Sequence, residues 1–173
     1  MHADVDTARV LARIAQGFEW TWKLDDMTRL CAAAGWSPPI PMNLGLYAST
    51  DCEVLRPDAW ALLDNGDPPR LSELEGPIEA VIVRVADLDD ASDEPPTESE
   101  LAQCHSMICE ALSVQLGSPS RRTDAPYPAT RWDLPTVIVE VQSLTNAVDL
   151  GFVNPAYQGW LDEQSLSEDD EYC

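Results

Sequence analysis

Two short turns constrain the fold of this chain more than any other feature of its sequence. They separate three segments rich in apolar and β-branched residues: Thr130–Asp133, Thr136–Ser143 and Ala147–Val153. The turns, Asp133-Leu134-Pro135 and Leu144-Thr145-Asn146, are too short to contain a crossover helix. Consecutive strands joined in this way run antiparallel, so the C-terminal half of the chain predicts an antiparallel sheet.

The N-terminal half contributes further strand candidates. The clearest is Ile78–Val85, which is apolar and β-branched on both faces, as expected of a strand in the middle of a sheet. Leu44–Tyr47 and Cys52–Arg56 are also predicted as strands, with Ser49-Thr50-Asp51 as the turn between them. The pattern of Ala59–Leu63 is ambiguous.

Apolar spacing and capping residues predict four helices. The best specified has a capping-box pattern at Thr97 and Glu100 and stops at Gly117. The other three are a helix that begins at Asp6 or Thr7, one that stops at Gly35, and a short one that runs from Asn154 through Leu161.

The order of these elements predicts an α+β fold. We expect an antiparallel sheet of about five or six strands with helices packed on one face. The same order resembles the secretion-chaperone-like fold, which is a scaffold for protein binding. The domain is expected to span residues 1–161, and the acidic residues 162–173 to form a C-terminal tail.

The charge balance is strongly acidic, with 31 acidic and 10 basic residues and a net charge of −21. A field of this sign repels phosphate groups, so it disfavours nucleic acid and anionic membrane surfaces as partners. It would attract a protein with a basic surface and speed their encounter. The alternative is that the charge only keeps the protein soluble.

Targeting signals and metal-binding patterns are not found in the sequence. The first residues are acidic and lack an apolar signal core, and no apolar run approaches the length of a membrane span. The five cysteines form no CxxC pair, and the two histidines are His2 and His105. These features predict a cytoplasmic protein with reduced thiols, no metal site and no cofactor.

One pair of residues could in principle support nucleophilic catalysis. His105 and Cys109 are four positions apart, so a helix places them on the same side. Such residues at apolar helical positions more often belong to core packing. No GxSxG, phosphate-loop or dinucleotide-binding glycine pattern occurs, and no calcium-loop pattern surrounds the paired carboxylates at 25–26, 89–90 and 169–170. The sequence therefore predicts a protein that is not an enzyme.

Two segments are the best-motivated contacts with a partner. The first is the acidic, proline-containing stretch Asp87–Glu100, expected to be a solvated loop, with Asp87, Asp89, Asp90, Asp93 and Glu94. The second is Asp58–Asp67, with Trp60, Asp64 and Asp67. Tryptophan is common among interface hot spots. Trp60, beside a turn-rich segment, is the first candidate for an exposed aromatic residue, and we expect the core to contain Trp20, Trp36 and Trp132.

Several stretches of the sequence resemble a known family. They are Phe18–Asp26 with Gly35-Trp36, Leu116–Ser120, Arg131–Pro135 and Val153–Leu161. In this order they are similar to the motifs of the actinobacterial domain-of-unknown-function family 6301. The resemblance covers most of the chain outside residues 38–75. That family has no catalytic motif, so the resemblance assigns no catalytic role to any residue.

The resemblance implies a function in protein binding. Members of the family look like neighbours of secreted polymorphic or type VII toxins. The nearest functional analogue is the immunity factor of the tuberculosis necrotizing toxin, an NAD-glycohydrolase. By this analogy the chain would be a cytoplasmic immunity protein that occludes the basic NAD-binding cleft of a cognate toxin. Two alternatives stay open: a secretion-system chaperone or adaptor that binds a secreted substrate protein, and a hydrolase that uses Cys109 and His105.

Overall fold

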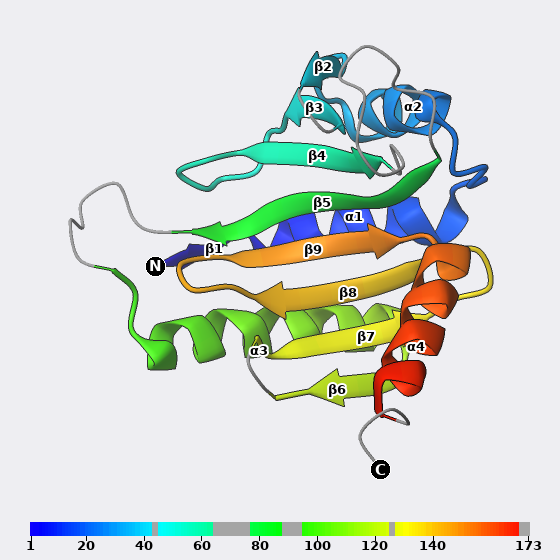
Figure 1. The fold of residues 1–173 in the computed structure, drawn as a ribbon. Helices are drawn as coiled ribbons and strands as arrows, with labels where there is room; N and C mark the ends of the chain where they lie inside the picture. Colours follow the sequence, from blue (N-terminus) through cyan, green and yellow to red (C-terminus); the bar gives the residue numbers. More distant parts are fainter. Residues whose placement is uncertain (43–44, 64–76, 88–94, 125–126, 170–173) are drawn as a thin grey trace.

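The chain forms one antiparallel sheet from two successive meanders of four strands each (Figure 1). The computed structural model describes residues 1–42, 45–63, 77–87, 95–124 and 127–169, and within them the sheet has nine strands. The first meander contains β2 (Ile40–Met42), β3 (Gly45–Ser49), β4 (Asp58–Leu63) and β5 (Ile78–Asp87). The second contains β6 (Arg121–Thr123), β7 (Ala129–Asp133), β8 (Ile138–Ser143) and β9 (Val148–Val153). The order across the sheet is β2-β3-β4-β5-β9-β8-β7-β6, and β1 (His2–Ala3) pairs with one end of β5.

The pairing of β5 with β9 joins the two meanders in the middle of the sheet. Its register places Val81 opposite Phe152 and Val83 opposite Leu150. All four side chains are completely buried, and burial of each stabilises the fold by roughly 1.5–3 kcal/mol. The prediction that Ile78–Val85 is a central strand is confirmed.

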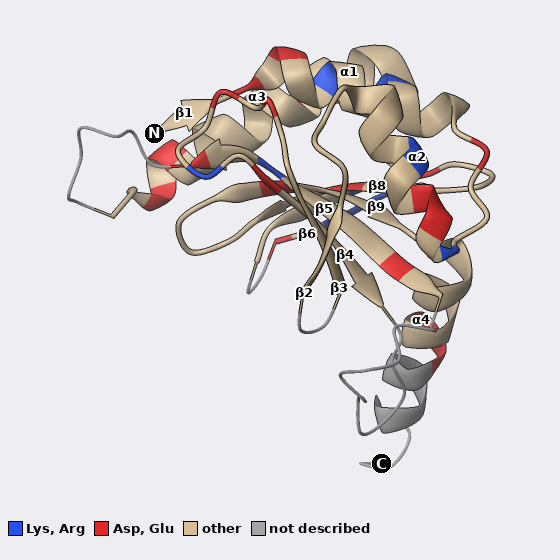
Figure 2. Cartoon of the chain, turned by 90° about the horizontal axis from the view of Figure 1, so that it is seen from above, with Lys and Arg blue, Asp and Glu red and all other residues tan. Residues whose placement is uncertain are grey.

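Three helices cover one face of the sheet, which we call the inner face (Figure 2). They are α1 (Val5–Gly17), α2 (Leu24–Ala34) and α3 (Glu98–Leu116). Their apolar sides form one core with the inward side chains of the strands. The fourth helix, α4 (Pro155–Asp169), lies on the opposite, outer face, where Asp162 approaches the guanidinium of Arg131 in β7 at 3.8 Å. The α+β class is confirmed, and helices α1–α3 share one face as predicted, whereas α4 does not.

The sheet is larger than the five or six strands predicted. The sequence does not reveal β1, β2 or β6, because each strand has only two or three residues. In addition, β2 contains Pro41 and β6 begins with Arg121-Arg122, so neither strand shows an alternation of apolar and polar residues. The prediction of a strand at Cys52–Arg56 is wrong. These residues form bends between β3 and β4, where the carboxylate of Asp4 accepts a hydrogen bond from the backbone N–H of Glu53 at 2.8 Å.

Other local predictions are confirmed. At the start of α3, the hydroxyl of Thr97 accepts from the backbone N–H of Glu100 at 3.2 Å, and the Glu100 carboxylate accepts from the N–H of Thr97 at 2.8 Å. Helix α2 ends at Gly35, whose φ of 77° lies in the left-handed region that glycine adopts at little cost. The ambiguous segment Ala59–Leu63 belongs to strand β4.

Two helix ends differ from the prediction. Helix α1 is capped by Asp4, whose carboxylate accepts from the backbone N–H of Thr7 at 3.0 Å, rather than by Asp6 or Thr7. Helix α4 continues to Asp169, beyond the predicted helix end at Leu161 and into the acidic segment that follows. The dense carboxylates of this segment therefore do not prevent a helix.

A buried carboxylate organises the aromatic segment between α1 and α2. Asp26 is completely buried. It accepts hydrogen bonds from the backbone N–H groups of Thr21 (2.7 Å) and Trp22 (2.6 Å), from the Thr21 hydroxyl (3.0 Å) and from the Arg29 guanidinium (2.8 Å). Trp22 has a φ of 57°, a left-handed conformation that is costly for a bulky residue. The bonds to Asp26 hold this turn, in which the rings of Trp20 and Trp22 stack at 4.4 Å.

The same segment ties the helices to both meanders. The backbone carbonyl of Trp22 accepts from the N–H of Ile78 at the start of β5 (2.9 Å). The indole N–H of Trp22 donates to the carbonyl of Thr136, just before β8 (3.2 Å). Trp20 packs against Phe152 of β9, with ring centroids 6.1 Å apart. One of the stretches that resemble the family therefore has a structural role.

Replacing Asp26 by alanine is expected to destabilise the fold by about 2–4 kcal/mol, because two backbone N–H groups and a guanidinium lose their acceptor. The matched control is Asp25→Ala, which removes the neighbouring exposed carboxylate and is expected to cost less than about 1 kcal/mol. Urea denaturation of both variants measures the difference. Equal losses would contradict the role assigned to Asp26.

Candidate functional site

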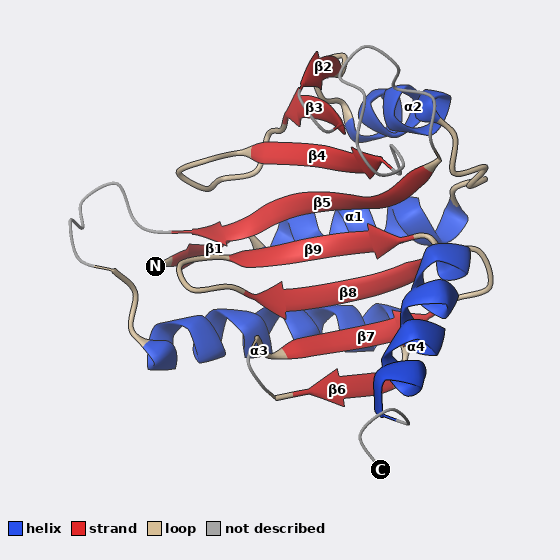
Figure 3. Cartoon of the chain, in the orientation of Figure 1, coloured by secondary structure: helices blue, strands red, loops and turns tan. Residues whose placement is uncertain are grey.

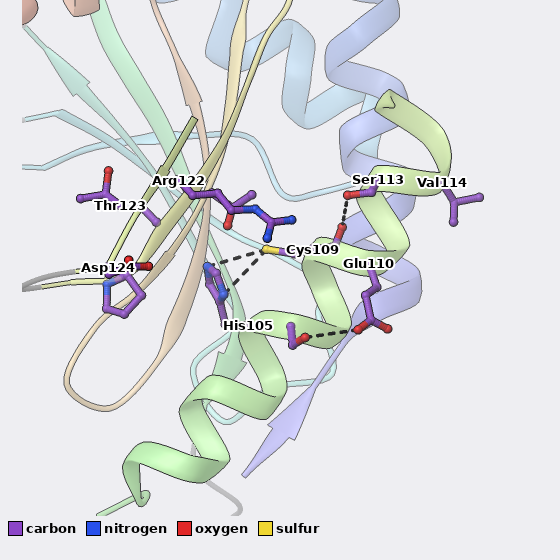
Figure 4. A pocket seen from close by; sticks show the side chains of 12 residues that line it. His105, Cys109, Glu110, Ser113, Val114, Arg122, Thr123 and Asp124 are labelled. Atoms are coloured by element: carbon purple, nitrogen blue, oxygen red, sulfur yellow. Dashed lines mark hydrogen bonds between the residues drawn. The ribbon is translucent and has the colours of Figure 1, made fainter. Parts of the chain in front are cut away.

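The first candidate site is a pocket of about 670 Å³ between α3 and the β6–β7 edge of the sheet (Figure 4). His105 and Cys109 line it from α3, and Arg122 lines it from β6. Four hydroxyl groups contribute to its polar lining: Ser106, Ser113, Thr123 and Thr130. The thiol and imidazole that the sequence places on one side of a helix therefore do meet in a pocket, and their geometry decides what they can do.

The contact between Cys109 and His105 lacks the geometry of a proton transfer. The sulfur lies 3.8 Å from Nδ1 and 3.7 Å from Nε2 of the ring. A thiol that donates to one ring nitrogen lies in the ring plane, much closer to that nitrogen than to the other. Nearly equal distances place the sulfur over the face of the ring instead. Nε2 also lies 3.2 Å from the carbonyl oxygen of Val141, and because a carbonyl only accepts, we assign the hydrogen to Nε2.

Burial favours the neutral form of both groups. Burial raises the pKa of the Cys109 thiol, against the opposing effects of a hydrogen bond with Thr130 and the charge of Arg122. Burial also lowers the pKa of the His105 imidazole, against the opposing effect of its hydrogen bond with Val141. Nucleophilic cysteines have a lowered pKa. This pair therefore lacks the electrostatics of an activated thiol as well as its geometry.

The second candidate site lies on the outer face of the sheet. Side chains alternate along a strand, so Tyr47 of β3, Trp60 of β4 and Ile82 of β5, which pair across the strands, project to this face. We define the outer patch as six apolar or aromatic side chains on β2–β5: Ile40, Met42, Tyr47, Trp60, Leu62 and Ile82. Ile40 and Met42 are 53% and 55% exposed, and the other four are partly buried. Helices α1–α3 lie behind the sheet and α4 crosses its β6–β9 half (Figure 3), so no helix of the described residues covers this patch.

Two ion pairs border the outer patch. The Nε atom of Arg84 lies 3.1 Å from the carboxylate of Asp149 across the β5–β9 pairing, and Nε of Arg56 lies 2.9 Å from the carboxylate of Asp87. Burial raises the pKa of Asp149, and the hydrogen bond from Arg84 opposes this. The Arg84 guanidinium carbon also lies 5.7 Å from the ring centroid of Trp60. Within each pair the arginine and the carboxylate neutralise each other's charge. The Arg84 guanidinium also restricts where the Trp60 ring can lie.

The structure separates the predicted contact residues. Trp60 belongs to the outer patch. The expectation that Asp87 lies in a solvated loop is wrong: it is the last residue of β5, completely buried and paired with Arg56, because the strand continues two residues beyond Val85. The other six predicted contacts lie outside the described residues: Asp64, Asp67, Asp89, Asp90, Asp93 and Glu94.

The tryptophans are distributed partly as predicted. Trp36 and Trp132 are buried, which confirms their assignment to the core, and Trp20 is partly buried against it. Trp60 is partly buried, whereas Trp160 on α4 is 53% exposed. Sequence reasoning missed Tyr47 as a neighbour of Trp60. The alternation of small and large side chains in Ala59-Trp60-Ala61-Leu62 is the signal that could have revealed one face of β4, whereas residues 45–49 show no such alternation.

Two kinds of site are not found in the part of the chain that the structure describes. No three His, Cys, Asp or Glu side chains there are grouped so as to hold a metal ion. No helix there is both long and apolar enough to span a bilayer.

The fold and its surface define a single-sheet α+β protein with one helix-covered face and one apolar patch on the other. The chain belongs to the family of unknown function DUF6301, whose sequence model matches residues 6–154. The match includes both meanders and the three helices of the inner face, and it confirms the resemblance to that family over residues 6–154. The motif Val153–Leu161 lies mostly beyond the matched residues. No curated protein and no solved structure matches the chain.

The buried imidazole makes stability depend on pH in a defined direction. Because the pKa of His105 is lowered in the folded chain, the unfolded chain binds the proton more readily. Stability should therefore be highest above the ordinary histidine pKa of about 6.5 and fall as the pH drops below it.

Replacing His105 by glutamine is expected to remove this part of the fall, whereas His2→Gln, at an exposed position, should retain it. Urea denaturation midpoints measured between about pH 7.5 and 5.5 test the prediction. Parallel pH profiles for wild type and His105→Gln would show that the imidazole is not the group responsible.

Proposed function

We propose that this chain is a binding protein without enzymatic activity, an immunity protein that binds and occludes a cognate secreted toxin domain in the cytoplasm. The observation that carries the proposal is the outer patch, a set of six apolar or aromatic side chains on four adjacent strands with no described helix over it. The neutral, face-packed contact between Cys109 and His105 supports a function that does not depend on covalent chemistry.

The composition of the outer patch favours a protein as its partner. Contiguous apolar surface with a polar rim is typical of protein interfaces, and Trp, Tyr and Met are enriched there. Trp60 and Tyr47 are adjacent on neighbouring strands, and Met42 extends the surface to the edge strand. A complex centred on this patch would bury about 1,200–2,000 Å² in total.

The net charge favours a basic partner. A protein of −21 attracts cationic surfaces and repels nucleic acid and anionic lipid. The proposed toxin class comes from the functional analogy with the immunity factor of the tuberculosis necrotizing toxin: a toxin cleft that binds the phosphates of NAD carries basic groups. The proposed partner is therefore a toxin domain, an NAD-glycohydrolase, with a basic cleft, and the chain itself needs no cofactor.

A secretion-system chaperone or adaptor is the second candidate, favoured by the exposure of Ile40 and Met42 on the edge strand β2. A chaperone that adds a substrate strand to this edge needs backbone donors there. Pro41 removes one donor from a strand of three residues, which disfavours that mode of binding. Binding of an unfolded substrate segment, but not of a folded toxin domain, would support this candidate over the immunity protein.

The variant Trp60→Asp is expected to weaken binding of the toxin domain encoded beside this gene by at least about thirtyfold, because it places a charge at a predicted hot spot. Met42→Glu, at a more exposed position, should act in the same direction with less effect on folding. The control is Val114→Asp on α3, where a side chain that is 84% exposed is replaced without loss of burial.

Affinity is measured by titration calorimetry and protection by the growth of cells that express the toxin. Circular dichroism confirms that each variant is folded. Equal affinity of the outer-patch variants and the control, or no binding of the neighbouring toxin domain by the wild type, would contradict the proposal.

A further inference from the structure

We propose that a groove within the outer patch, bordered by Tyr47, Asp58 and Trp60, receives a long cationic side chain, arginine or lysine, from the protein partner. This inference rests on the proposed function and specifies its chemistry. The groove has a volume of about 360 Å³, and Met42 and Leu62 contribute to its apolar lining. We call it the cation groove.

The groove is a consequence of a glycine in β3. Gly45 pairs with Met42 of β2 on one side and with Leu62 of β4 on the other, so no side chain stands between these two. A Cβ atom at Gly45 would overlap the backbone carbonyl oxygen of Ala61, which means that another residue cannot fill the space without moving the strand. The space between Met42 and Leu62 is therefore built into the strand pairing.

The rim of the groove carries a carboxylate with capacity to accept more hydrogen bonds. The Tyr47 hydroxyl donates to Oδ1 of Asp58 at 2.5 Å. This bond raises the pKa of Tyr47, so the hydroxyl keeps its proton and the carboxylate remains the acceptor. No other described residue donates to Asp58, and a carboxylate has about four acceptor sites. A guanidinium or ammonium group could donate to the remaining sites.

The charged side chains around the groove carry one more negative charge than positive charges, and the additional one is that of Asp58. Arg56 pairs with Asp87 and Arg84 with Asp149, so the two cations near the groove already have their carboxylates. The carboxylates close to Arg56 are those of Asp87, Asp149 and Asp58. Of these, Asp58 has no ion pair of its own among the described residues. Its negative charge, within a chain of net charge −21, therefore favours a cation from outside.

The aromatic and apolar walls suit the rest of such a side chain. Aromatic faces attract cations, and Trp60 already has the Arg84 guanidinium 5.7 Å from its centroid. Arginine and lysine bury their methylene stems on apolar surface while the charged end reaches a polar group. Met42 and Leu62 offer that surface, and Asp58 offers the polar group. A neutral side chain of the same shape would lose the charge attraction to Asp58 and to the aromatic faces.

Two short peptides test the inference without the toxin: acetyl-Gly-Arg-Gly-amide and its neutral isostere, acetyl-Gly-citrulline-Gly-amide. Each is titrated into the full chain, and the NMR shifts of the Trp60 indole N–H and the Tyr47 backbone N–H are followed. We expect saturable shifts at both positions with the arginine peptide and at least tenfold weaker binding of the citrulline peptide. Asp58→Asn retains an oxygen that can accept from Tyr47 and should remove the preference for arginine. Asp133→Asn, at an exposed carboxylate of β7, should retain it.

Three results would overturn the inference. The two peptides could bind equally, Asp58→Asn could retain the preference for arginine, or the NMR shifts could spread over all acidic surfaces. The outcome is separable from that of the proposed function. If the peptides show no preference while Trp60→Asp still abolishes toxin binding, the cation groove is wrong and the outer patch stands. If the groove prefers arginine but outer-patch variants bind the toxin normally, the proposed function is wrong.

Discussion

The antiparallel pairing of β5 with β9 is the interaction on which the rest of this structure depends. The two meanders come from separate halves of the chain, and these two strands connect them into one sheet. On the inner face the pairing buries Val81, Val83, Leu150 and Phe152 beneath the helices. On the outer face it brings Arg84 and Asp149 together, beside Trp60. Loss of this register would remove both the core and the position of the outer patch.

Because the core lies between the sheet and the helices of its inner face, the two faces of the sheet have different roles. The inner face requires apolar side chains at alternate positions, and it has them from Ala48 on β3 to Trp132 on β7. The outer face is freer, and it combines an apolar patch on β2–β5 with ion pairs near the middle and α4 over the other half. We propose that this outer face recognises the surface of another protein.

Much of the fold could be predicted because local signals agree with it. The β-branched run at Ile78–Val85 indicates a central strand, the pattern at Thr97 and Glu100 indicates a helix start, and the C-terminal turns indicate antiparallel neighbours. The site was harder to predict because it depends on distant pairs. Asp87 belongs to an acidic run in the sequence, and its burial depends on distant contacts with Arg56, 31 residues earlier, and with the strand β1. The groove depends on Gly45, which is significant only once β3 lies against β4.

The central claim is that the outer patch, and not the α3 pocket, contacts a protein partner. Hydroxyl-radical footprinting of the chain, alone and with the cognate toxin domain, tests it directly because the radical oxidises exposed Met, Tyr and Trp side chains. Met42 in the outer patch is 55% exposed and Met107 on α3 is 45% exposed, so the two act as matched reporters on opposite faces. The account predicts that the toxin protects Met42, Tyr47 and Trp60 while Met107 is oxidised as before. Protection of Met107 with unchanged oxidation of Met42 would contradict it.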